Sequence, residues 1–149
     1  MAETAVTGGE RIAAAFDAAR AQGRASLMPY MVGGFPDQET SRAVADAYVD
    51  SGADLIELGI PFSDPLADGP VIHAAATAAL KAGATLESVL GLCERIAAAV
   101  PVVPMVYANM VLARGPGEFA RMLENAGFRD VRADPLTIGI VYLYTARRS

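Results

Sequence analysis

Helical and strand patterns alternate along the first two thirds of the chain, and this alternation limits the fold more than any other feature. Amphipathic periodicity predicts helices over residues 9–22, 37–52, 71–83 and 85–100. Short apolar runs bounded by glycine and proline predict strands over residues 26–34, 53–60 and 101–109. Strands that alternate with helices in this way form βα units around a parallel sheet. The pattern therefore predicts an α/β fold that begins with three βα units.

The order of elements changes in the last quarter of the chain. Residues 115–128 predict a helix, and residues 129–134 and 136–148 predict two strands. Because a parallel connection needs about a dozen or more residues, these closely spaced strands are expected to form an antiparallel hairpin. We expect the hairpin to extend the parallel sheet into an open three-layer α/β/α arrangement of about five strands. The whole chain, 1–149, is then a single α/β domain.

Charge and cysteine content exclude several classes of function. The net charge is −5 and no basic stripe is present, so nucleic acid is not an expected partner. The single cysteine, Cys93, excludes an intrachain disulfide and fits a reducing compartment. No apolar run reaches the ~20 residues that span a membrane, and the first residues lack a signal-peptide pattern. We expect a soluble, cytoplasmic protein without a membrane partner.

The strand predicted over 53–60 carries a carboxylate within its apolar sequence. Period-two alternation places Glu57 on the face opposite Ile56 and Leu58. A buried carboxylate is costly unless it is paired or has a raised pKa, and a raised pKa suits a general acid or base. The residues leave two interpretations open: a catalytic group, or a glutamate bonded to backbone amides or to an arginine.

A loop rich in proline and acidic residues follows this strand directly. Its sequence is PFSDPLADGP, residues 61–70. Sites in parallel α/β sheets form at the carboxyl ends of strands, where this loop lies. We expect Glu57 and Asp68 to meet over one pocket there. The alternative for Asp68-Gly69-Pro70 is an ordinary turn that precedes a helix.

Residues 8 to about 113 resemble the N-terminal part of the tryptophan synthase alpha subunits, a family of TIM-barrel lyases. The stretches that carry the resemblance are PYMVGGFPD, GADLIELGIPFSDPLADGPVI and VPMVYANMVL. The resemblance implies a carbon–carbon lyase that splits indole-3-glycerol phosphate into indole and glyceraldehyde 3-phosphate by a retro-aldol step. In that reaction the ring accepts a proton at C3 and the glycerol hydroxyl loses one.

The resemblance also implies residue roles. Glu57 matches the acid/base, and Asp68 matches the carboxylate that engages the indole nitrogen. The remaining matches are indole-pocket positions (Tyr30, Met105 and Tyr107) and positions that face the beta subunit (Pro61, Asp64 and Asn109). That partner carries pyridoxal phosphate, whereas this chain is expected to need neither a cofactor nor a metal.

Residues 116–149 resemble a different family. The stretch GEFARMLENAGFRDVRADPLTIGIVYLYTARR is similar to the C-terminal helix and hairpin of class I S-adenosylmethionine methyltransferases of the ubiquinone/menaquinone type. We therefore predict an engineered chimera of a 1–115 segment and a 116–149 segment.

A TIM barrel has eight βα units and usually binds phosphate after strands 7 and 8, and neither loop is found in this sequence. The expected protein is thus a scaffold without efficient activity. One alternative is a residual lyase that works through Glu57 and Asp68. The other is an oligomer whose copies associate through their partial sheets.

Overall fold

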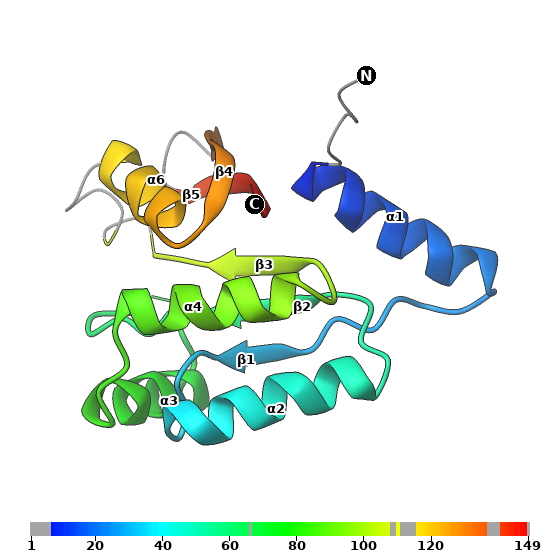
Figure 1. Cartoon of the computed structure of the whole chain (residues 1–149). Helices are drawn as coiled ribbons and strands as arrows, with labels where there is room; N and C mark the ends of the chain where they lie inside the picture. Colours follow the sequence, from blue (N-terminus) through cyan, green and yellow to red (C-terminus); the bar gives the residue numbers. More distant parts are fainter. Residues whose placement is uncertain (1–6, 66, 108–109, 111–115, 137–140, 149) are drawn as a thin grey trace.

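Three parallel strands form the central sheet of the computed structural model, which describes residues 7–65, 67–107, 110, 116–136 and 141–148. The strands are β1 (Tyr30–Val32), β2 (Ile56–Gly59) and β3 (Val102–Met105), and they lie in the order β1-β2-β3 (Figure 1). The register sets Tyr30 beside Glu57, and Glu57 beside Val103. The predicted parallel α/β arrangement is confirmed.

Helices connect these strands as the periodicity predicted. They are α1 (Gly8–Ala21), α2 (Gln38–Asp50), α3 (Pro70–Lys81), α4 (Leu86–Ala97) and, further along the chain, α6 (Pro116–Asn125). Local sequence explains where they begin. Asp37 accepts a hydrogen bond from the Thr40 N–H at 2.8 Å, and Thr85 accepts one from the Ser88 N–H at 3.2 Å. Such side-chain caps satisfy N–H groups that the first helical turn leaves unpaired.

One face of the central sheet carries the hydrophobic core. The apolar side chains that alternate with Glu57 share this core with side chains from α2 and α4; its members include Met31, Ala45, Ile56, Leu58, Ile60, Val89, Leu90, Cys93 and Ile96. The predicted two faces of β2 are therefore observed. The pKa of the Cys93 thiol rises to about 12 because the side chain is buried.

The opposite face of the sheet is open to solvent in part. Tyr30 keeps 36% of its surface exposed and Met105 keeps 49%. Helices α2 and α4 share the core on the other side, so the described residues do not form the expected three-layer sandwich. A sheet with its helices mainly on one face is what a segment of barrel wall presents, since barrel helices form an outer ring.

The C-terminal strands form a sheet of their own. Strands β4 (Phe128–Leu136) and β5 (Val141–Arg148) pair antiparallel, as predicted, but they do not join the central sheet. The expectation of one five-stranded sheet is therefore wrong. Phe119 of α6 and Phe128 of β4 enter the core that α4 shares, so this unit attaches by apolar packing rather than by strand pairing. An irregularity between Arg129 and Arg132 also interrupts the β4–β5 ladder.

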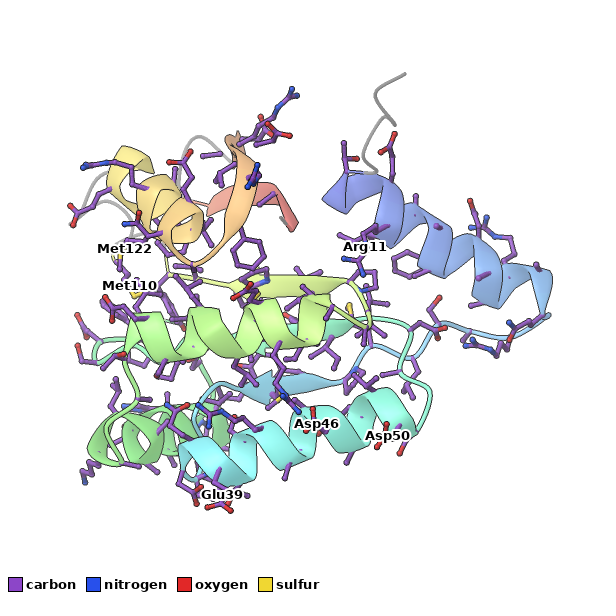
Figure 2. The ribbon with its side chains drawn as sticks, in the orientation of Figure 1. Arg11, Glu39, Asp46, Asp50, Met110 and Met122 are labelled. Atoms are coloured by element: carbon purple, nitrogen blue, oxygen red, sulfur yellow. The ribbon has the colours of Figure 1, made fainter. Side chains whose placement is uncertain are left out.

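Helix α1 reaches the end of α4 through one polar contact. The Arg11 guanidinium donates to the Ala97 carbonyl oxygen at 2.8 Å (Figure 2). A cation at the C-terminus of a helix is favourable because it meets unpaired carbonyl groups and the negative end of the helix dipole. Most α1 residues are exposed, and Ala19 is the helix's buried residue. This hydrogen bond ties α1 to the C-terminal end of α4.

Candidate active site

The candidate site begins with Glu57 in the middle of β2. Its backbone N–H donates to the Pro29 carbonyl oxygen at 3.0 Å, which holds β2 against the chain entering β1. The side chain is half-buried on the open face. Its carboxylate has no hydrogen-bond or ion-pair partner among the described residues. The structure therefore offers no support for a purely structural glutamate paired with backbone amides or an arginine.

Both predicted carboxylates affect the hydroxyl group of Tyr30. The pKa of Tyr30 rises to about 12, first because the ring is partly buried and then because Asp68 and Glu57 place negative charge near its hydroxyl. Asp68 comes from the loop after β2, whereas Tyr30 comes from β1. Glu57, which pairs with Tyr30 in the strand register, and Asp68, from the loop after β2, therefore both act on the Tyr30 hydroxyl electrostatically. That the two carboxylates share one pocket stays a prediction.

Tyr107 joins this group from the segment after β3. The Ala67 N–H donates to the Tyr107 hydroxyl at 3.3 Å. Burial raises the pKa of Tyr107, and a hydrogen bond and charge from Asp68 raise it further. Phe62 stacks on the Tyr107 ring with centroids 5.8 Å apart and an interplanar angle of 25°. These contacts hold the acidic loop against the end of β3.

Gly59 provides the space in which the Tyr30 ring lies. A Cβ atom built on Gly59 would overlap the Tyr30 hydroxyl and lie 2.8 Å from its Cζ. Cβ atoms in real structures essentially never approach other heavy atoms that closely. The missing side chain at Gly59 therefore allows Tyr30 to cross β2 beside Glu57.

An acidic residue at the other end of β2 fixes where the strand begins. The Asp54 carboxylate accepts two hydrogen bonds from Arg24, at 2.6 and 2.7 Å, and one from the Leu27 N–H at 2.8 Å. These bonds lower the pKa of Asp54 to about 2, with the Arg24 bond as the largest cause. The Asp54 N–H in turn donates to the Leu27 carbonyl at 3.0 Å. These hydrogen bonds hold the segment before β1 against the start of β2.

The other predicted site residues fall into two groups. Met105 pairs with Gly59 in the strand register and lies on the same open face as Tyr30. Of the predicted partner-facing residues, Pro61 is buried and Asp64 is exposed, while Asn109 lies outside the described residues. Sequence analysis missed Phe62 and Gly59. A lone aromatic residue in a polar loop was the available signal for Phe62.

Neither a metal cluster nor a membrane-spanning helix is found among the described residues. They contain no group of three or more His, Cys, Asp or Glu side chains placed to hold a metal ion. No helix among them is long and apolar enough to cross a membrane. The side chains that converge are two carboxylates and two tyrosines, which suit proton transfer and the binding of an aromatic ring.

Fold and site together define a class of protein: an α/β chain built like part of a βα-barrel wall, with an acid/base and aromatic site at the carboxyl ends of its strands. The family model "Tryptophan synthase alpha chain" matches residues 16–132. This chain belongs to the tryptophan synthase alpha chain family.

Individual relatives support the same assignment. The tryptophan synthase alpha chain of Synechococcus elongatus is 49% identical over 114 residues, which are 75% of this chain and 43% of that protein. The alpha chain of Gluconacetobacter diazotrophicus is 48% identical over 120 residues, covering 78% and 44%. This chain thus spans less than half the length of these relatives.

Solved structures agree with these matches. The tryptophan synthase of M. tuberculosis in an open form with BRD0059 bound superimposes with a TM-score of 0.71 at 44% identity, covering 78% of this chain and 47% of that one. The tryptophan synthase complex from Pyrococcus furiosus gives a TM-score of 0.61 at 36% identity, covering 68% and 43%.

These findings correct the prediction of an engineered chimera. The family match continues to residue 132, across the boundary expected between residues 115 and 116, through α6 and into β4. Nothing in the comparisons supports a methyltransferase-like origin for the C-terminal segment. The predicted scaffold of mixed origin is therefore wrong, and the alternative of an alpha-chain-like lyase fits the comparisons better.

Proposed function

We propose that this chain carries the acid/base part of a lyase site that splits indole-3-glycerol phosphate into indole and glyceraldehyde 3-phosphate. The observation that carries the proposal is that Glu57 pairs with Tyr30 in the strand register, while the loop that carries Asp68 is bonded to the Tyr107 hydroxyl beyond the end of β3. The retro-aldol step needs two proton-handling groups and a flat apolar surface, and these residues supply both.

Each side chain has a role in this proposal. The protonated Glu57 carboxyl gives its proton to C3 of the indole ring; the carboxylate that remains then takes the proton of the hydroxyl on the glycerol carbon, the bond from C3 to that carbon breaks, its electron pair returns to the ring, and the aldehyde forms. Asp68 accepts a hydrogen bond from the ring N–H and stabilises the positive charge that develops there. Tyr30, Met105 and Tyr107 contact the ring. Because this chain spans under half of its relatives' length, the activity of the whole protein is part of the proposal.

A ligand-binding experiment tests the assignment of Asp68. The sequence contains no tryptophan, so the fluorescence of added indole can be followed without tryptophan background. We expect saturable quenching of indole, weakened by roughly tenfold in Asp68→Asn because a hydrogen bond to a charged group is lost. Indole fluorescence that changes linearly with protein concentration, without saturation, would refute an indole-binding pocket.

A turnover experiment tests the assignment of Glu57. We expect Glu57→Gln to abolish indole formation from indole-3-glycerol phosphate while indole binding stays within a factor of about two, since the amide keeps the shape but transfers no proton. Glu124→Gln on the exposed surface of α6 is the matched control and should leave both readouts unchanged. Equal turnover by Glu57→Gln and the parent would remove Glu57 from the mechanism.

The proposal includes contact with a second subunit. The Pyrococcus furiosus neighbour is a tryptophan synthase complex, and the loop after β2 presents exposed Asp64 beside the candidate site. A tryptophan synthase beta chain immobilised on a sensor should bind this chain, and Asp64→Arg should weaken binding by charge reversal. Equal binding by both proteins would place the contact elsewhere.

A further inference from the structure

Phe62 lies beside the candidate site but has no role in the proposed chemistry. It follows β2 after Ile60 and Pro61, and both of these residues are buried. The Ile60 N–H donates to the Met105 carbonyl oxygen at 3.0 Å, so the chain is still paired with β3 two residues before Phe62. Proline also restricts the backbone at residue 61. The Phe62 side chain therefore starts from a fixed point.

Tyr107 starts from a fixed point on the neighbouring strand. It follows β3 by two residues, and its carbonyl oxygen accepts a hydrogen bond from the N–H of buried Met110 at 3.1 Å. The register pairs Gly59 with Met105, so Phe62 and Tyr107 leave the same end of the sheet. Their rings stack with centroids 5.8 Å apart. This distance lies inside the range of about 4.5–7 Å that aromatic pairs prefer.

The hydroxyl of Tyr107 holds the far part of the acidic loop. It accepts a hydrogen bond from the Ala67 N–H at 3.3 Å. Asp68 is the next residue, and Gly69 after it is the N-cap of α3. The backbone of Asp68 thus lies between the Ala67 hydrogen bond and the start of a helix. One phenol ring therefore contacts the loop twice, at Phe62 by stacking and at Ala67 through its hydroxyl.

We propose that Phe62 is a positioning residue for Asp68. Its ring fixes the direction of the Tyr107 phenol, and the phenol hydroxyl then holds the Ala67 N–H. Through Ala67, the stack sets where the Asp68 carboxylate lies. Burial raises the pKa of Tyr107, and a hydrogen bond and charge from Asp68 raise it further, which agrees with this arrangement. The consequence for indole binding rests on the proposed function, whereas the hold on Ala67 does not.

Amide hydrogen exchange at Ala67, followed by NMR on the full chain, separates this role from simple packing. Phe62 also packs against the hydrophobic core, so a loss of stability alone does not identify a positioning residue. Phe62→Leu keeps an apolar side chain but removes the ring, and it should speed Ala67 exchange by about five- to tenfold because one hydrogen bond is lost. Tyr107→Phe keeps the stack, removes the hydroxyl and should speed exchange equally. Adding Phe62→Leu to Tyr107→Phe should have no further effect.

Phe16→Leu is the matched control, since Phe16 is 42% exposed on α1. It should leave Ala67 exchange at the parent rate. If circular dichroism shows that Phe62→Leu is unfolded, Phe62→Met replaces it, because methionine fills irregular apolar space without a ring. Equal Ala67 exchange in the Phe62 variant and in Phe16→Leu would overturn the inference, as would parent-like exchange in Tyr107→Phe.

Indole binding shows whether this positioning serves the proposed function. Phe62→Leu should weaken indole quenching by about three- to tenfold in the parent but by less than about twofold in Asp68→Asn, because both changes act through one carboxylate. An equal loss in both backgrounds would overturn the inference, since Phe62 would then act on indole without Asp68. Faster Ala67 exchange in Phe62→Leu, together with no indole binding by the parent, would support the hold on Ala67 and refute the proposed function.

Discussion

Replacing Gly59 tests whether the site is packed as the structure describes. A methyl group at this position would lie 2.8 Å from Cζ of Tyr30 and 3.1 Å from its Cε2. Carbon atoms in contact prefer about 3.5–4.0 Å, so Cζ must move by roughly 0.7 Å, and the Tyr30 hydroxyl, which the methyl group would overlap, must move further. We expect Gly59→Ala to lower the free energy of unfolding by about 1–2 kcal/mol, the lower part of the range for overpacking, since the partly exposed ring has room to move.

A double-mutant cycle isolates the cause. With Tyr30→Ala the obstacle is absent, and Gly59→Ala should then stabilise the strand by about 0.5–1 kcal/mol because alanine has less backbone entropy to lose than glycine. The coupling energy from urea unfolding, followed by circular dichroism, should be about 1.5–3 kcal/mol. In the Tyr30-containing protein, Gly59→Ala should also reduce indole quenching, since the displaced ring no longer lies beside Glu57.

Gly91 provides the matched control for this cycle. It lies in α4, and a Cβ atom built there meets nothing within 4 Å. Gly91→Ala should stabilise by about 1 kcal/mol whether or not Tyr30 is present. Identical effects of Gly59→Ala in both backgrounds would refute the packing of Tyr30 over Gly59.

Three further outcomes are expected. Gly33→Ala should destabilise by about 1–3 kcal/mol, because its Cβ would lie 2.5 Å from a Val89 methyl carbon, and Val89→Ala should relieve part of that loss in a double-mutant cycle by urea unfolding. The lowered pKa of Asp54 contributes stability that is present above its ordinary value of 3.8 and is lost as pH falls toward about 2. Asp54→Asn should therefore make the free energy of unfolding less dependent on pH across that window. A pH dependence equal to that of the parent would contradict this. Buried Cys93 should react with a thiol reagent only as fast as the protein opens, so a rate independent of denaturant would contradict its burial.

Much of the fold follows from local pattern. The caps at Asp37 and Thr85 locate two helix starts, and period-two alternation places Glu57 opposite Leu58. These features depend on neighbours within about four residues, which a sequence displays directly. The place of the hairpin was not predictable in the same way. Its attachment depends on Phe119 and Phe128 meeting the core that α4 shares, a contact between distant segments.

The candidate site, like the fold, could be predicted from the sequence only in part. Local pattern together with the family resemblance predicted Glu57, Asp68, Tyr30 and Tyr107 as site residues. The contacts that hold them together, Phe62 stacked on Tyr107 and Tyr30 lying over Gly59, were not foreseen. Ring stacking and the space left by a glycine depend on where neighbouring strands and loops lie, so sequence spacing does not reveal them.

The sequence by itself determined a βα rhythm, a carboxylate facing away from the apolar side of its strand, and an acidic loop directly after it. Only the tertiary structure decided that the charges of both carboxylates raise the pKa of Tyr30 and that the hairpin forms its own sheet. Only the tertiary structure also left one face of the parallel sheet open. The physical reason is that alternation and capping are properties of adjacent residues, whereas convergence and exposure depend on how whole elements pack.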